Sequence, residues 1–235
     1  MKNQIASQVL LLTKCFLVGA LEIAVLSLSQ SSYATTAADY RALGLRYRQQ
    51  GQLDAAIAAL TQAVALEPDN LDGRIALGWT QHLAAQRQAA AQTLTAVAWA
   101  DPYKVQAFNA LGIVYLVSGD LALAIASHMW ALLLKPDNEI AYYNLSLACQ
   151  RIQSYDWAIV TAMRAAELEP TNPHPLIALA LAHWSQGNRA AAQAAYTQAL
   201  ALDDRYGDLG FLAYLAEAGF SADQIEVTQQ ILKSR

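Results

Sequence analysis

Residues with the chemistry for catalysis or metal binding are few in this sequence, and they are spread along it. The histidines are His82, His128, His174 and His183. None has a second metal ligand three or four residues away, the spacing that puts two ligands on one face of a helix. The two cysteines, Cys15 and Cys149, cannot build a four-thiolate zinc site or a disulfide framework. There is also no glycine-rich phosphate loop and no nucleophile elbow. We therefore expect no metal site, no cofactor and no catalytic residue, and predict that the protein is not an enzyme.

Three of these residues fit a packed core better than a reactive site. His128 and His183 take positions that a repeating pattern, described below, gives to aromatic side chains. Cys149 lies at a similar core position, where a free thiol is usually inert. We expect all three to be structural.

The composition indicates a helical protein and excludes two broad classes. Hydrophobic residues make up 55% of the 235 residues and charged residues 14%, well below the roughly 25% of an average soluble domain. A disordered tail protein is excluded, because the chain has ample apolar surface with which to fold. The net charge of −4, with 15 Lys and Arg, excludes the basic face that a nucleic-acid partner requires. The abundant alanine favours helices.

The first 34 residues differ from the rest. Lys2 and Lys14 precede a mostly apolar run, residues 15–28, and small residues occupy positions 32 and 34. A basic start, an apolar run of about 7–15 residues and small residues before a cleavage point are typical of a signal peptide. We expect cleavage after Ala34 and export to the periplasm or the thylakoid lumen.

Two alternatives stay open for residues 1–34. The span 5–27 is long enough for an uncleaved membrane anchor, since a membrane helix needs about 20 residues. It would place Lys14 and Glu22 in the bilayer, each at a cost of a few kcal/mol. The other alternative is an amphipathic helix that crosses no membrane. Membrane contact is expected only through residues 1–34, if they are not cleaved.

A period of 34 residues runs through most of the remaining chain. Pro68, Pro102, Pro136 and Pro170 mark it, and they divide the chain into the units 37–70, 71–104, 105–138, 139–172 and 173–206. The seventh position of every unit is leucine, namely Leu43, Leu77, Leu111, Leu145 and Leu179. The eighth position is always Gly, Ser or Ala, and the twentieth is always Ala. Such a period predicts a stack of identical structural units.

Each unit is predicted to fold as a hairpin of two helices. Apolar residues recur at helical spacing in both halves of a unit, as in Ile57, Leu60 and Val64. Gly51 and Gly119 stand where the first helix should end in a left-handed cap. The proline then ends the second helix. The small residues at the eighth, twentieth and twenty-seventh positions allow the two helices to approach closely.

This pattern resembles the tetratricopeptide repeat (TPR) family. The matching residues of the first unit are Tyr40, Leu43, Gly44, Tyr47, Ala56, Leu60, Ala63 and Pro68. The resemblance covers residues 37–206 and implies an all-α, right-handed α-solenoid of five TPR hairpins within residues 35–206. Departures such as Arg74 and Gln81 weaken individual units without shifting the register. The Ala- and Gln-rich units are similar to those of cyanobacterial members, which favours a bacterial source; together with the signal-peptide pattern of residues 1–34, this predicts an exported bacterial TPR protein.

Residues 207–235 are predicted to form a C-terminal pair of capping helices. Leu209, Leu212 and Leu215 recur at helical spacing before Gly219, and a Ser221–Gln224 capping-box signature begins a last helix. Because the last hairpin of a solenoid leaves an apolar end uncovered, we expect this pair to cover it.

The resemblance also implies where a partner would bind. In this family the first helices line a concave groove, and its residues here are mostly apolar. The predicted groove residues are Arg41, Leu45, Arg48, Ile75, Trp79, Leu83, Asn109, Ile113, Leu116, Tyr143, Leu147, Ile177, Leu181 and Trp184. Three aromatic residues among them could anchor a partner, and the two arginines could orient an acidic end. Ordinary packing between hairpins is the alternative interpretation of this apolar stripe.

We therefore expect a non-catalytic scaffold that binds an apolar or amphipathic segment of a protein or peptide partner and aids assembly of an envelope or membrane complex. The carboxylate clamp of some TPR proteins needs Lys and Asn at positions that here hold Leu45, Ile75 and Trp79 among others. A chaperone co-factor with that clamp is therefore not expected. The alternatives are a membrane-anchored assembly factor on the cytoplasmic side and a lipid or small-molecule carrier.

Overall fold

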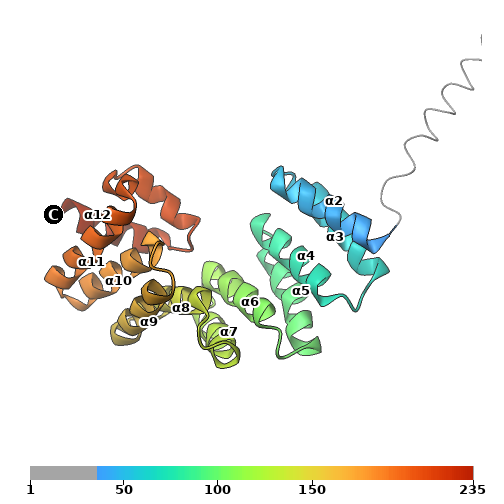
Figure 1. The fold of residues 1–235 in the computed structure, drawn as a ribbon, viewed down its shortest axis with the longest axis horizontal. Helices are drawn as coiled ribbons and strands as arrows, with labels where there is room; N and C mark the ends of the chain where they lie inside the picture. The colour runs from blue at the N-terminus through green and yellow to red at the C-terminus, as the bar shows by residue number, and fades with distance from the viewer. Residues whose placement is uncertain (1–35, 235) are drawn as a thin grey trace, which may run out of the picture.

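The computed structural model describes residues 36–234, which form five consecutive helical hairpins and a C-terminal segment (Figure 1). The hairpins are α2 (Ala37–Gln49) with α3 (Leu53–Leu66), α4 (Leu71–Leu83) with α5 (Arg87–Ala100), α6 (Val105–Ser118) with α7 (Leu121–Leu134), α8 (Glu139–Arg151) with α9 (Tyr155–Leu168), and α10 (Pro173–Gln186) with α11 (Arg189–Leu202). Each first helix begins at the residue that opens its predicted unit. The all-α solenoid of five hairpins is confirmed.

The turns inside the hairpins follow the predicted caps in three units and depart from them in two. Gly51, Gly119 and Gly187 have φ values of +74°, +89° and +95°, a left-handed conformation that glycine adopts without steric cost. Ala85 and Gln153 hold the equivalent positions of the second and fourth units with φ values of 58° and 61°. The register of the stack therefore imposes this turn even where the sequence offers no glycine.

Small residues allow the two helices of each hairpin to pack closely. The alanines at the twentieth position are fully buried in all five units, namely Ala56, Ala90, Ala124, Ala158 and Ala192. A Cβ atom on Gly78 would lie 2.7 Å from Leu94 Cγ, and one on Gly112 would lie 2.4 Å from the ring of His128. The eighth position must therefore be small wherever a large side chain of the second helix packs against it.

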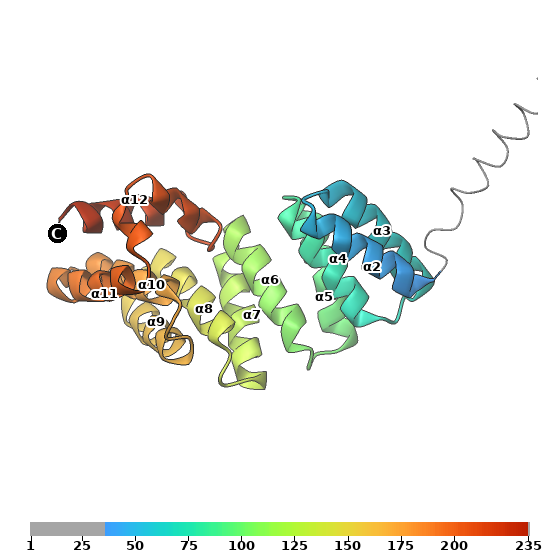
Figure 2. The ribbon, with the colours of Figure 1, turned by 45° about the horizontal axis from the view of Figure 1, so that its top comes forward.

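The C-terminal segment packs against the last hairpin, as predicted, but it differs in form from a pair of α-helices and it extends beyond that hairpin. It contains the short 3₁₀ helices η1 (Asp204–Gly207) and η2 (Phe211–Ala216) and the α-helix α12 (Ala222–Lys233). The Ser221–Gln224 capping box is confirmed. Residues 207–234, called the tail below, do not extend the stack beyond α11. The tail turns back over the hairpins of α8 to α11, as both views show (Figures 1 and 2).

Two expectations from the sequence concern other parts of the chain. Between residues 36 and 234, none of the helices is sufficiently long and apolar to cross a bilayer. The predicted signal peptide or anchor, with its cleavage point at Ala34, lies outside the described residues.

Candidate functional site

The first helices of the five hairpins line the inner side of the stack. Successive first helices pack against each other, α4 on α6, α6 on α8 and α8 on α10. This inner packing leaves the second helices on the outside of the curve (Figure 2). The predicted groove residues all belong to first helices, so the structure places them along the inner face.

The tail covers the C-terminal half of this inner face. Leu212, Leu215 and Ile231 of the tail are fully buried, and they belong to one apolar cluster with Leu147 and Leu181 of the first helices. Burial of a Leu or Ile side chain stabilises a protein by about 1.5–3 kcal/mol. The tail therefore packs with its apolar side against the inner face of the last hairpins.

Specific hydrogen bonds fix the tail in this position. Tyr143 donates its hydroxyl hydrogen to the carbonyl oxygen of Ala218 at 2.5 Å. The buried side-chain amide of Gln224 donates to the carbonyl oxygen of Leu147 at 3.1 Å and to Gln150 Oε1 at 2.8 Å. Gly219, with φ +86°, packs directly on Leu147. These hydrogen bonds pair particular tail residues with particular residues of the first helices, and so they fix the alignment of the tail along the inner face.

Six predicted groove residues are consequently not open to a partner. Four are fully buried and two are part-buried against the same cluster, namely Leu116, Leu147, Ile177 and Leu181, and Tyr143 and Trp184. The prediction of one continuous groove is corrected here. The sequence identified an apolar inner face, and the chain supplies its own cover for half of it.

Residues 36–234 leave the N-terminal half of the inner face uncovered. Leu45 and Leu83 are 36% and 45% exposed, and Ile75, Trp79 and Ile113 are part-buried. Ile75 and Trp79 rest on the core of the second and third hairpins, so they form a firm apolar floor. We call these five residues, with Arg41 and Arg48, the open half-groove.

Charges at the open half-groove are partly paired. Arg41 forms an ion pair with Glu67, and its hydrogen bond, followed by that of Asn70, lowers the pKa of the Glu67 carboxyl. Lys104 Nζ lies 2.8 Å from Asp72 Oδ1. Arg48 takes part in none of the ion pairs between residues 36 and 234. An acidic group at this end would therefore meet Arg48 without displacing an internal partner.

Asn109 was predicted to face a partner in the groove, but its side chain contacts the next hairpin instead. Its side-chain amide exchanges two hydrogen bonds with Asn138, at 2.8 and 3.3 Å. Asn138 is also the N-cap of α8, where its side chain accepts from the backbone N–H of Ala141. Asn109 thus joins the third hairpin to the fourth, and we remove it from the candidate partner-binding residues.

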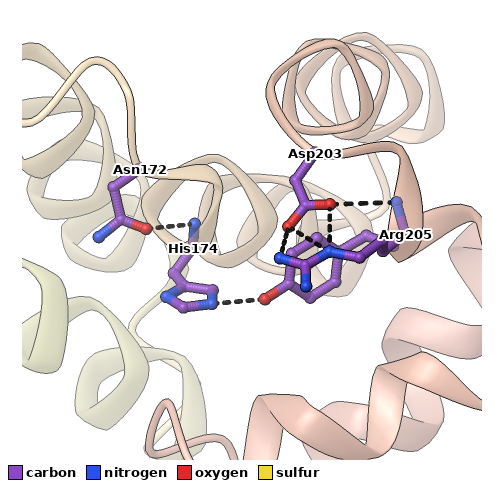
Figure 3. Close-up of polar contacts among 5 residues, drawn as sticks. Asn172, His174, Asp203 and Arg205 are labelled. Atoms are coloured by element: carbon purple, nitrogen blue, oxygen red, sulfur yellow. Dashed lines mark hydrogen bonds and ion pairs between the residues drawn. The ribbon is translucent and has the colours of Figure 1, made fainter.

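Polar side chains gather where the tail leaves the last hairpin (Figure 3). His174 Nε2 lies 2.6 Å from the Tyr206 hydroxyl, and burial is the main cause that lowers the pKa of His174. Arg205 donates two hydrogen bonds to Asp203 Oδ2, at 2.7 and 3.3 Å, which lowers the pKa of that carboxyl. Tyr206 and Arg205 also line a cavity of about 450 Å³ beside Tyr143. The arrangement anchors the turn that sends the tail back over the groove.

His128 and Cys149 are buried, as predicted for core residues, whereas His183 is only part-buried. His128 is fully buried, and burial lowers its pKa to about 3. Cys149 is a buried free thiol whose pKa is raised by burial. His183 is less buried than predicted. Residues 36–234 contain no group of three His, Cys, Asp or Glu side chains that could hold a metal ion.

The tail residues that contact the first helices were not identified from the sequence. Phe220 and Gln224 are both almost fully buried, and no local pattern marks either as a contact with the first helices. The available signal was the leucine spacing before Gly219, which indicated an apolar face without indicating the surface that it meets.

Comparison with protein families identifies the repeats. A family model described as "TPR repeat" matches residues 44–83, and one described as "Tetratricopeptide repeat" matches residues 174–206. Residues 44–83 and 174–206 thus match models of the tetratricopeptide repeat. Two matched segments, one near each end of the stack, thus agree with the 34-residue period that links them.

Two curated proteins are similar to part of this chain. Tetratricopeptide repeat protein 28 of Homo sapiens is 35% identical over 118 residues, which is 49% of this chain. The Hsp70-Hsp90 organizing protein of Triticum aestivum is 38% identical over 88 residues, or 37% of this chain. The matches span only 5% and 15% of the lengths of these relatives.

Solved TPR structures share the fold at low sequence identity. MamA from Desulfovibrio magneticus RS-1 matches with a TM-score of 0.66 and 20% identity, covering 74% of this chain and 98% of that one. A thermophilic TPR protein of Thermus thermophilus matches with a TM-score of 0.62 and 22% identity, covering 78% of this chain and 98% of that one. These similarities support the TPR solenoid.

Proposed function

We propose that this protein is a non-catalytic scaffold whose open half-groove binds an apolar or amphipathic segment of a protein partner. TPR proteins act as protein-interaction scaffolds. The observation that carries the proposal is the tail itself, which lies in the other half of the same inner face. The tail shows which kind of segment this face accepts, namely one that buries leucine side chains and offers backbone carbonyl groups to hydrogen-bond donors.

The open half-groove offers the same chemistry to a segment from another protein. Trp79 is its largest apolar residue, and its ring centroid lies 5.0 Å from that of His82 with the two rings tilted by 33°. The pKa of His82 is lowered mainly by burial and also by the charge of Arg87. A neutral His82 keeps this part of the floor apolar near neutral pH. Leu83 and Leu45 extend the surface on either side, and Arg48 favours an acidic residue at one end of the partner segment.

The wider part of the proposal concerns location and pathway. The apolar run at residues 15–28 supports export, or a membrane anchor, and hence a task in assembly of an envelope or membrane complex. The intact mass of the native protein distinguishes the two: a chain that starts at Thr35 supports export, and a chain that starts near Met1 supports an anchor.

Replacing Trp79 with glutamate is expected to abolish partner capture. In crosslinking capture from native cells, a partner held by the wild type should be lost by Trp79→Glu, because a carboxylate at the centre of an apolar contact typically costs at least 2 kcal/mol, or about 30-fold in affinity. Leu83→Glu should act in the same direction, and its site is exposed enough to keep the protein folded. Circular dichroism would verify folding of both variants.

A matched control is available on the same chain. Trp99 is 82% exposed on the second helix α5, and Trp99→Glu should retain the partner. A partner retained by both folded groove variants would move binding to another surface and contradict the proposal. Capture of no protein by the wild type would count against a protein scaffold and would favour the carrier alternative.

A further inference from the structure

The outer face of the third and fourth hairpins is unusually apolar for a surface. Helix α7 has no charged residue along its whole length, Leu121–Leu134. Leu123, Met129 and Leu133 on its outer side are between 51% and 70% exposed. The neighbouring helix α9 adds Trp157 and Val160, which are 64% and 59% exposed.

The apolar patch on this face is larger than the largest apolar patch that a monomer normally exposes. Together with Trp130, Ile152 and Met163, these residues expose roughly 900 Å² of side-chain surface, against about 300–600 Å² for the largest apolar patch of a typical monomer. A stable protein interface buries about 800 Å² on each partner. We call these eight residues the α7/α9 face, and its area is that of one side of a standard interface.

The α7/α9 face carries both a recess and a projection. A crevice of about 380 Å³ runs between α7 and α9, with Leu145 and Cys149 of α8 at its floor. Trp157 forms part of the crevice wall, and with Val160 and Met163, spaced three residues apart on α9, it begins a ridge that leads away from the crevice along the helix. A two-fold symmetric dimer requires a surface that carries both a projection and its matching recess. The ridge and the crevice meet this requirement on one face.

The charges near the face argue against a lipid surface as the occupant. The charged residues of α9 are Asp156, Arg164 and Glu167, and Arg164 is paired with Glu167 at 2.9 Å. Helix α7 adds no Lys or Arg. A surface without unpaired basic groups gains nothing from the negative potential of anionic lipids.

We propose that the α7/α9 face is a homodimer interface in which the α9 ridge of each copy enters the α7/α9 crevice of the other. The two-fold axis relates the two faces, so the concave sides of both copies point away from the contact. Dimerisation therefore leaves both open half-grooves accessible and presents two partner sites per particle.

The test is sedimentation velocity of the full chain over a range of concentrations. The wild type is expected to sediment as a dimer. Val160→Glu places a carboxylate in the interface twice, once per copy, and should weaken dimerisation about 100-fold. Leu66→Glu is the control, because Leu66 is 53% exposed on the outer side of α3, in a different hairpin, and it should leave the dimer intact.

Hydrogen exchange locates the contact independently of any variant. Amides of α7 and α9 should gain protection as the protein concentration rises, and those of α3 should not. A wild type that is monomeric at all concentrations would overturn the proposal. The same holds if the monomeric protein binds neutral vesicles and Val160→Glu abolishes that binding, because the face would then contact lipid. Equal association of Val160→Glu and the wild type would also overturn it, because association would then come from elsewhere, such as residues 1–34.

Discussion

Leu215→Ala is expected to lower the free energy of unfolding by about 3 kcal/mol, even though Leu215 lies outside the repeats. The side chain is fully buried in η2 between the tail and the first helices. Truncation would leave a cavity in the cluster that Leu215 shares with Leu181 and would weaken the packing of the tail on the first helices. Urea denaturation followed by circular dichroism would measure the change.

The same substitution at a nearby leucine is the control for this prediction. Leu209 is 42% exposed, and Leu209→Ala should cost less than about 1 kcal/mol. Limited proteolysis of Leu215→Ala should also cut within residues 207–234 earlier than in the wild type. Small and equal effects of the two substitutions would show that the tail does not contribute to the core as the structure indicates.

Acidification from pH 7 to pH 4.5 is expected to destabilise the protein by about 2–3 kcal/mol through His128 alone. Burial keeps the pKa of His128 at about 3 in the folded protein, against an ordinary value of 6.5. Between these two pKa values His128 is protonated in the unfolded chain and neutral in the folded protein. Stability is full above about pH 6.5 and falls as the pH decreases from there towards 3.

His128→Phe should remove most of this pH dependence. The two ring nitrogens of His128 are buried without a hydrogen-bond partner, so the substitution should also stabilise the protein at pH 7 by about 1 kcal/mol. His183→Phe should keep most of the pH dependence, since His183 is only part-buried. The experiment is urea denaturation between pH 4.5 and 7. An unchanged pH slope in His128→Phe would refute the assignment to this residue.

The repeat architecture could be predicted because its determinants are local and periodic. A buried alanine such as Ala90 or Ala158 recurs every 34 residues for one packing reason, the close approach of two helices. The first helices begin where the period places them, from Ala37 to Pro173. Even the turns at Ala85 and Gln153 keep the register, because the packed helices before and after each turn fix a left-handed conformation that glycine would adopt more easily.

The candidate site was harder to predict because it depends on contacts between distant parts of the chain. Leucine spacing identified an apolar face near Leu212 and Leu215, but the same spacing suits docking on α11 or on α8 and α10. The bond from Tyr143 to Ala218 joins residues 75 positions apart, and no local pattern specifies it. The pairing of Asn109 with Asn138 is likewise non-local, so the prediction placed Asn109 in the groove.

The position of the tail imposes an order on folding during synthesis. All five hairpins are translated before residues 207–234, and at about 5–20 residues per second the ribosome takes a few seconds to complete that last stretch. Throughout this interval Leu147, Ile177 and Leu181 lack the cover that buries them in the finished protein. The nascent chain is therefore most prone to non-specific association just before the tail emerges, and a chaperone that protects it would have to bind the inner face of the last hairpins and dissociate when the tail docks.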